Sequence, residues 1–380
     1  MTTTVARDGQ SELSTFRDAQ TGREIWQLTH SDQASFHSYY DLCPWSPDGT
    51  KIVFCGMTPG QDGADIYWLD VADGTIHWCG HSQLAGPHEG AQQQWLGADA
   101  RIIYKDRDDD GLCVRIVDLA TGEQTRLPGT LRMAAPDGQR LASFTDIRDE
   151  AALARRNDAG LFLSGLDGAA PRLLVSLAAA LAVNPQRDAI ANRHLYIKHP
   201  KWSPAGDRLM FVFTNEIHFE QQYAEPRVKD VYVVDADGTN LRYVCDFALG
   251  HHPSWHPDGL HVFLNRRPAP NQSFQFLLVD TDTGLAVPAT TVIEGSGHPS
   301  FSPDGRRILA EYVTAPYGGA ARVVSIDLPA NRVDELARFT VRDHTHQGTH
   351  IHPTWSRDGR FALFNADYSG HAEVYVAPMA

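Results

Sequence analysis

Short runs of hydrophobic and β-branched residues recur along the whole chain, and turns rich in Gly, Pro and Asp separate them. In the clearest copy the runs are Lys51–Phe54 and Asp65–Val71, and after an Asp-Gly turn the chain continues as Asp73–Trp78. Runs of this length, bounded by turn residues, are typical of β-strands. A further run precedes the first turn, so each copy predicts four strands. The pattern therefore predicts an all-β protein.

The turn that follows the first strand of each copy has a recurrent sequence, Trp-Ser-Pro-Asp-Gly. Pro restricts φ and Gly supplies a positive φ, which suits a tight turn. The turn recurs at a spacing of about fifty residues, the period of propeller blades. Five clear and two degenerate copies lie at 45–49, 95–99, 135–138, 202–206, 255–259, 301–305 and 355–359. Seven copies predict a seven-bladed β-propeller.

The two ends of the chain complete this pattern. The last copy stops after a third strand, Ala372–Ala377, and residues 18–28 resemble an isolated fourth strand. We expect the N-terminal strand to pair into the last blade and close the propeller, because this pairing removes two open sheet edges. The sequence thus predicts a loose tail at 1–14 and one domain at 15–380. Segments 149–157 and 173–193 are predicted to be partly helical, and 214–230 to form a loop.

Composition and charge restrict the classes of function. The chain has 380 residues, 42% of them hydrophobic, and 33 Lys and Arg against 47 Asp and Glu give a net charge of −14. A general nucleic-acid or membrane binder needs a basic face, which argues against both. The protein could still bind a small anionic substrate if positive charge were concentrated at the binding site, for instance as a bound metal ion. The five scattered cysteines and the absence of a recognisable signal or membrane-spanning segment predict a cytoplasmic protein.

Histidines recur at one position of the repeat, six residues before the Asp of the turn. The four C-terminal copies carry His199, His252, His298 and His352 there, and each is followed by Pro. Equivalent positions on the innermost strands of neighbouring blades face the propeller axis. We therefore expect these imidazoles to converge.

More potential ligands precede the last of these histidines, in Gln347-Gly-Thr-His350-Ile-His352. Alternate residues of an extended segment point the same way, so His350 and His352 should lie together, with Gln347 able to add an oxygen. A nitrogen and oxygen donor set without thiolate suits Mn²⁺, Zn²⁺ or Ni²⁺. Other histidines are predicted to lie singly and without a functional role: His30, His77, His81, His88 and His371.

The chain resembles the oligogalacturonate lyases, polysaccharide lyase family 22, over nearly its whole length. The resemblance lies in residues 18–29, in His37 with the Tyr39-Tyr40 pair, in the His-Pro strand starts and in the Gln-x-x-His-x-His-Pro segment. It implies cytosolic β-elimination of short pectin-derived galacturonides. It also implies that Mn²⁺ is held by His298, Gln347, His350 and His352, and that His252 is the catalytic base.

One position departs from that family. The family has an Arg where this chain has Asp230, with Arg227 and Lys229 nearby. We expect Arg227, Lys229 and His199 to bind substrate. The departure leaves open a lyase for another uronate, and the same ligands would also serve a hydrolase or an epimerase. A TolB-like propeller that only binds proteins is the non-enzymatic alternative. Oligomeric state is not predicted.

Overall fold

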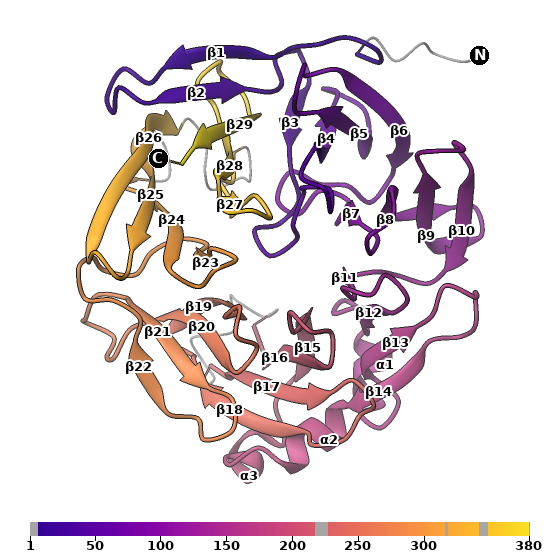
Figure 1. Ribbon diagram of the computed structural model, residues 1–380. Helices are drawn as coiled ribbons and strands as arrows, with labels where there is room; N and C mark the ends of the chain where they lie inside the picture. The colour runs from indigo at the N-terminus through magenta and orange to yellow at the C-terminus, as the bar shows by residue number, and fades with distance from the viewer. Residues whose placement is uncertain (1–6, 217–226, 316–317, 342–348, 380) are drawn as a thin grey trace. The chain divides into compact units, whose positions relative to one another are not determined.

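The computed structural model describes residues 7–216, 227–315, 318–341 and 349–379. Its strands form seven antiparallel sheets, the blades of a seven-bladed β-propeller, as the repeat predicts. The chain divides into two compact units, Met1–Thr130 with Ser296–Ala380 (unit 1) and Leu131–Gly295 (unit 2). Figure 1 labels the strands of each blade, and the two units are described in turn.

Unit 1 contains blades 1, 2, 6 and 7. Blade 1 consists of β3 (Ala34–Phe36), β4 (Lys51–Met57), β5 (Ala64–Asp70) and β6 (Ile76–Ser82). Blade 2 consists of β7 (Gln94–Trp95), β8 (Arg101–Asp108), β9 (Gly111–Asp118) and β10 (Gln124–Pro128). Blade 6 consists of β23 (Ser300–Phe301), β24 (Arg307–Val313), β25 (Gly319–Asp327) and β26 (Arg332–Val341). Blade 7 consists of β27 (Thr354–Trp355), β28 (Phe361–Ala366), β29 (Glu373–Pro378), β2 (Glu24–Gln27) and β1 (Ser14–Arg17).

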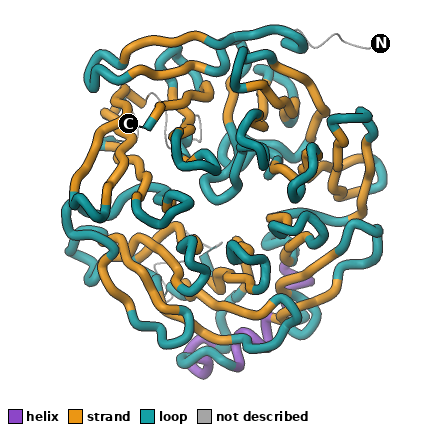
Figure 2. The backbone as a smooth tube through the Cα atoms, viewed as in Figure 1, coloured by secondary structure: helices purple, strands orange, loops and turns teal. Residues whose placement is uncertain are grey.

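Unit 2 contains blades 3, 4 and 5. Blade 3 consists of β11 (Met133–Ala134), β12 (Leu141–Phe144), β13 (Gly160–Ser164) and β14 (Arg172–Ser176). Blade 4 consists of β15 (Tyr196–Trp202), β16 (Arg208–Thr214), β17 (Lys229–Asp235) and β18 (Arg242–Asp246). Blade 5 consists of β19 (Gly250–Trp255), β20 (His261–Arg266), β21 (Gln275–Asp280) and β22 (Ala286–Pro288). Helices α1 (Glu150–Ala154), α2 (Leu177–Ala182) and α3 (Arg187–Ile190) fall in the two segments predicted to be helical, and Figure 2 shows them in purple.

The N-terminal strand completes blade 7, as predicted. Strand β2 pairs with β29 through Trp26 and Val376, and β1 adds a fifth strand outside it. Ile25 of β2 is fully buried in the hydrophobic cluster between blades 6 and 7. The N-terminal strand is therefore held against the C-terminal strands by hydrophobic packing as well as by strand pairing.

Part of the predicted N-terminal tail makes defined contacts. The side chain of Arg7 is 5% exposed, and its guanidinium donates to Glu12 Oε2 at 2.7 Å and to Ser35 Oγ at 2.9 Å. Residues 7–13 therefore differ from a loose tail, because they lie against blade 1. The prediction that 15–380 forms one domain stays a prediction.

The Trp of the repeat has a defined role within each unit. Its indole Nε1 donates to a backbone carbonyl oxygen of the preceding blade's innermost segment in blades 2, 4, 5 and 7. These bonds join Trp95 to Pro44 (2.7 Å), Trp202 to Met133 (3.3 Å), Trp255 to Lys201 (3.0 Å) and Trp355 to Ser300 (3.2 Å). Hydrophobic clusters between successive blades of each unit surround these bonds. The repeat thus specifies blade-to-blade attachment as well as the turn.

We predict that Trp95→Phe lowers the free energy of unfolding by about 0.5–1.5 kcal/mol, because it removes the indole donor from the buried Pro44 carbonyl oxygen, which then keeps only the bond from the backbone N–H of Val53. Urea unfolding followed by circular dichroism measures this loss. Trp26→Phe is the matched control, since the indole of Trp26 donates to the exposed side chain of Glu24. An equal loss in both variants would contradict the role of the inter-blade bond.

Candidate functional site

The repeat position that carries the predicted histidines has an unusual backbone in four blades. Its φ is +53° at Gln92, +51° at His199, +56° at His252 and +44° at His352. In blades 4 and 5 the strand pairing also shifts there, which marks a β-bulge. A positive φ is strained for a residue other than Gly, and bulges reorient side chains beside functional sites. These histidines are therefore not ordinary strand residues.

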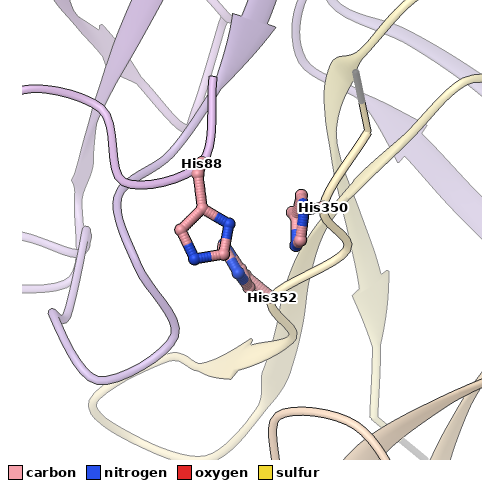
Figure 3. A group of neighbouring side chains, drawn as sticks. All are labelled: His88, His350 and His352. Atoms are coloured by element: carbon pink, nitrogen blue, oxygen red, sulfur yellow. The ribbon is translucent and has the colours of Figure 1, made fainter. Parts of the chain in front are cut away.

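Three imidazoles of unit 1 converge just before β27. Figure 3 shows the rings of His88, His350 and His352 close together, and one ring nitrogen from each lies within 4.8 Å of the others. The ring centroid of His350 lies 4.2 Å from that of His88 and 5.2 Å from that of His352. The expectation that His350 and His352 point the same way is confirmed.

His298 lies beside this group. Its ring centroid is 4.4 Å from that of His352 and 6.1 Å from that of His350. Unit 1 therefore brings together three of the four predicted metal ligands. The fourth, Gln347, lies outside the described residues, so its role stays a prediction.

His88 was predicted to lie singly, and this prediction is wrong. The residue belongs to the connection between β6 and β7, which carries no repeat signature. Its ring packs edge-on against His350 and lies 5.2 Å from the centroid of His352. Only the fold brings it to the other imidazoles.

A buried carboxylate orients His298. Glu311 of β24 is 2% exposed, and its Oε1 lies 2.5 Å from Nδ1 of His298. The backbone N–H of His298 also donates to both carboxylate oxygens, at 2.9 and 3.0 Å. A proton on Nδ1 leaves Nε2 as the nitrogen with a lone pair. Carboxylate–histidine pairs of this kind set the tautomer and orientation of metal-binding histidines.

His352 is fully buried, and neither of its ring nitrogens has a hydrogen-bond partner among the described residues. Burial lowers its pKa well below the ordinary value, and the neighbouring imidazoles of His298, His88 and His350 lower it further. The ring is therefore neutral at physiological pH. A buried polar group without a partner costs about 1–3 kcal/mol, which a bound cation would offset.

Two tyrosines pack against the imidazoles. Tyr39 and Tyr40, which follow β3, are 5% and 2% exposed. The ring centroid of Tyr39 lies 4.8 Å from that of His352, and the centroid of Tyr40 lies 5.3 Å from that of His298. These aromatic rings restrict the imidazole orientations and exclude water from one side of the group.

The predicted substrate-binding residues lie in unit 2, where cations surround one carboxylate. Lys198 and Arg227 both donate to Glu216, and Lys229 Nζ lies 3.2 Å from Glu216 Oε1. Burial lowers the pKa of Lys229 to about 8, although Glu216 opposes this shift. Burial would raise the pKa of Glu216, but attraction to Lys229 and Lys198 holds it below its usual range. Three cations against one carboxylate leave local positive charge.

Further cations act on His199. Burial lowers the pKa of His199 well below its ordinary value, and positive charges on Lys198, Arg132, Lys201 and Lys229 lower it further. Arg132 and Lys201 are 1% and 3% exposed, and the sequence did not single out either residue. The last predicted residue, His252, is half-buried, with its ring centroid 5.6 Å from that of His251. A concentration of cations in an acidic protein favours an anionic ligand.

Comparisons with known proteins agree on the fold. No protein-family profile matches the chain. An oligogalacturonate lyase in complex with manganese superposes with a TM-score of 0.72 at 19% identity, covering 98% of each chain. An oligogalacturonate lyase from Vibrio parahaemolyticus gives 0.69 at 18% identity, covering 98% of this chain and 99% of the other. This chain shares the fold of oligogalacturonate lyases. The β-propeller domain of the Trilobed protease from Pyrococcus furiosus gives 0.55 at 8% identity, covering 91% and 96%.

The resemblance to oligogalacturonate lyases makes the departure at Asp230 informative. The Asp230 side chain is 7% exposed, and its Oδ2 accepts from Asn184 Nδ2 at 2.8 Å, which also donates to the Tyr232 hydroxyl. Neighbouring residues of a strand point to opposite faces. Lys229 thus takes the other face, toward Glu216 and the Gly250 carbonyl oxygen. Lys229, not the residue at 230, supplies positive charge on that face.

Burial raises the pKa of Asp230 to about 7, although the Asn184 donor opposes the shift. An ordinary Asp in the unfolded chain titrates near pH 4. The folded state holds the Asp230 proton more tightly than the unfolded chain does. The protonated carboxyl therefore contributes fully to the free energy of unfolding below about pH 4, and this contribution is lost as the pH rises through 7.

We predict that Asp230→Asn removes this pH dependence, since the amide does not titrate. Between about pH 4 and pH 7 the stability of the variant relative to the wild type should rise by up to about 1.4 kcal/mol per pH unit. Urea unfolding of both proteins at pH 5 and at pH 8 measures the change. The same stability difference at both pH values would show that Asp230 does not titrate in this range.

Among the described residues, none of the helices has the length and hydrophobicity that crossing a membrane requires.

Proposed function

We propose that the protein is a divalent-metal-dependent lyase that cleaves short, pectin-derived oligogalacturonides by β-elimination. The observation that carries the proposal is the convergence of His88, His350 and His352 in a chain that shares the fold of oligogalacturonate lyases over 98% of its length. One of those lyases is known in complex with manganese. The cations of unit 2 support an anionic substrate.

The imidazole group fits a divalent cation. His88, His350 and His352 would supply three nitrogens. His298, whose ring contacts Glu311 and lies beside that of His352, would supply a fourth. The sequence resemblance adds the side-chain oxygen of Gln347. Such nitrogen-rich sites without thiolate bind Mn²⁺, Zn²⁺ or Ni²⁺, and Mn²⁺ is the ion that the resemblance implies.

In the proposed reaction the imidazoles of unit 1 hold the metal ion, and His252 acts as the base. A divalent cation held by these imidazoles would act as a Lewis acid toward the uronate carboxylate beside C5. His252 takes the C5 proton, a role assigned by the sequence resemblance, and imidazole is a common general base near neutral pH. Loss of that proton and departure of the 4-linked sugar leave a double bond between C4 and C5.

Recognition of the substrate falls to the cations of unit 2. Arg227, Lys229 and Lys198 bind the carboxylates of the oligosaccharide as cations, and His199 binds them as a neutral hydrogen-bond donor. Lys is a compact point charge, whereas Arg forms a planar, two-pronged contact with carboxylates. The use of Lys229 beside Asp230 is therefore expected to alter the preferred uronate or chain length relative to the family.

We predict that His350→Ala and His88→Ala each weaken Mn²⁺ binding by more than about tenfold, because each removes a nitrogen donor. Isothermal titration calorimetry on metal-free protein measures the affinity. His252→Ala should retain the wild-type affinity and lose activity. His81→Ala is the matched control, since its imidazole lies beside Asp65, away from the group. Full metal binding by His350→Ala would disprove the ligand assignment, and full binding by His88→Ala would remove His88 from it.

The reaction itself is tested by a continuous ultraviolet assay on digalacturonate and trigalacturonate, before and after chelation and with Mn²⁺ restored. Elimination creates a double bond conjugated to the carboxylate, so absorbance should rise only with metal present. Parallel measurement of reducing ends separates hydrolysis, which releases them without absorbance. Release without absorbance, or no reaction by protein that contains bound metal, would overturn the proposed lyase reaction on these substrates.

A further inference from the structure

Blade 5 departs from the repeat at the turn between its first two strands. In blades 1, 6 and 7 a Ser hydroxyl donates to the carboxylate of the turn Asp. These pairs are Ser46–Asp48 (2.6 Å), Ser302–Asp304 (2.6 Å) and Ser356–Asp358 (2.7 Å). Blade 5 has His256 in place of the Ser. Five residues later it has His261, where blades 1, 4 and 6 carry Lys51, Arg208 and Arg307.

Both substitutions place an imidazole on the same carboxylate. Oδ2 of Asp258 lies 3.0 Å from Nδ1 of His256 and 2.8 Å from Nδ1 of His261. One potential donor atom from each of the three residues lies within 4.8 Å of the others. Their side chains are 17%, 33% and 31% exposed in sequence order, so an ion can reach them from solvent.

The backbone holds the carboxylate ready for this contact. Oδ1 of Asp258 accepts the N–H groups of Leu260 at 2.8 Å and His261 at 3.1 Å. These bonds fix the orientation of the carboxylate and leave Oδ2 directed at the two imidazoles. Hydrogen bonding of the second oxygen is a common feature of carboxylates that bind metals.

The Nδ1 atom of His256 lies between two groups of Asp258. It is 3.3 Å from the backbone N–H of Asp258 and 3.0 Å from its carboxylate oxygen. A proton on this nitrogen would donate to the carboxylate, and in its place a metal ion could bind the nitrogen and the oxygen together. In blades 1, 6 and 7 the Ser hydroxyl donates to the Asp and offers no nitrogen to a metal.

We propose that His256, Asp258 and His261 form a second metal site, which binds a divalent transition-metal ion such as Zn²⁺. Two imidazole nitrogens and one carboxylate oxygen, with water completing a tetrahedron, are a common ligand set for Zn²⁺. Imidazole ligands favour the later transition metals over Mn²⁺. The site does not depend on the proposed lyase function, since all of its donors belong to blade 5. An ion there would join the end of β19 to the start of β20.

The test is a Zn²⁺ titration of metal-free protein by calorimetry, with the wild type compared to the double variant His256→Ser, His261→Arg. These substitutions restore residues that other blades carry at the same positions, so the variant is expected to fold, and circular dichroism checks this. The wild type should bind one more equivalent of Zn²⁺ than the double variant. Zn²⁺ should also raise the unfolding temperature of the wild type more than that of the variant.

Each single variant, His256→Ser or His261→Arg, should weaken binding of that equivalent at least tenfold, and this comparison stands even where the double variant is unstable. Equal stoichiometry and affinity in the wild type and the variants would overturn the proposal. Loss of the imidazole group of unit 1 through His350→Ala should leave the blade 5 equivalent unchanged, which keeps the two sites distinguishable.

Discussion

The hydrogen bond from a Trp indole to the innermost segment of the preceding blade is the constraint on which the candidate site depends. It occurs in blades 2, 4, 5 and 7. The same four blades have a left-handed residue three positions before that Trp: Gln92, His199, His252 and His352. In blade 1 the Trp45 indole has no hydrogen-bond partner among the described residues, and Leu42 at the equivalent position has no positive φ. Strained backbone persists only where its surroundings over-determine it, and the indole bond supplies that restraint.

In blade 6 the histidine at this repeat position is held in place by different contacts. Blade 6 has Phe301 in place of the Trp, and His298 lies three residues before it with the left-handed conformation transferred to Gly297, at φ +55°. A Cβ on Gly297 would lie 2.4 Å from the Glu311 carboxyl carbon. Glycine therefore allows the carboxylate to approach the His298 backbone and ring. Where the indole restraint is missing, a buried carboxylate takes over the positioning of the imidazole.

The fold and much of the site can be predicted from the sequence because the repeated motif determines both the number of blades and the positions of several histidines. The turn motif predicts seven blades, and the alignment of His298 and His352 on it predicts that their side chains meet, as they do at a ring separation of 4.4 Å. His88 could not be found in this way, since it lies in a connection outside the repeat. Arg132 and Lys201 were missed for a similar reason: no periodic signal separates a Lys or Arg that acts on a neighbouring imidazole from one that is merely solvated.

The charge distribution explains how an acidic chain can be suited to an acidic ligand. A net charge of −14 would repel an anion at long range, but salt screens that effect beyond about 10 Å, so local charge decides binding. In unit 2, Lys198, Arg227 and Lys229 share the single carboxylate of Glu216, and burial weakens the screening of these charges by water. Glu216 lowers the cost of keeping the three cations close together before a ligand arrives. In the function proposed above, an entering carboxylate would exchange with Glu216 or join it, and Glu216 would then influence affinity alongside the cations.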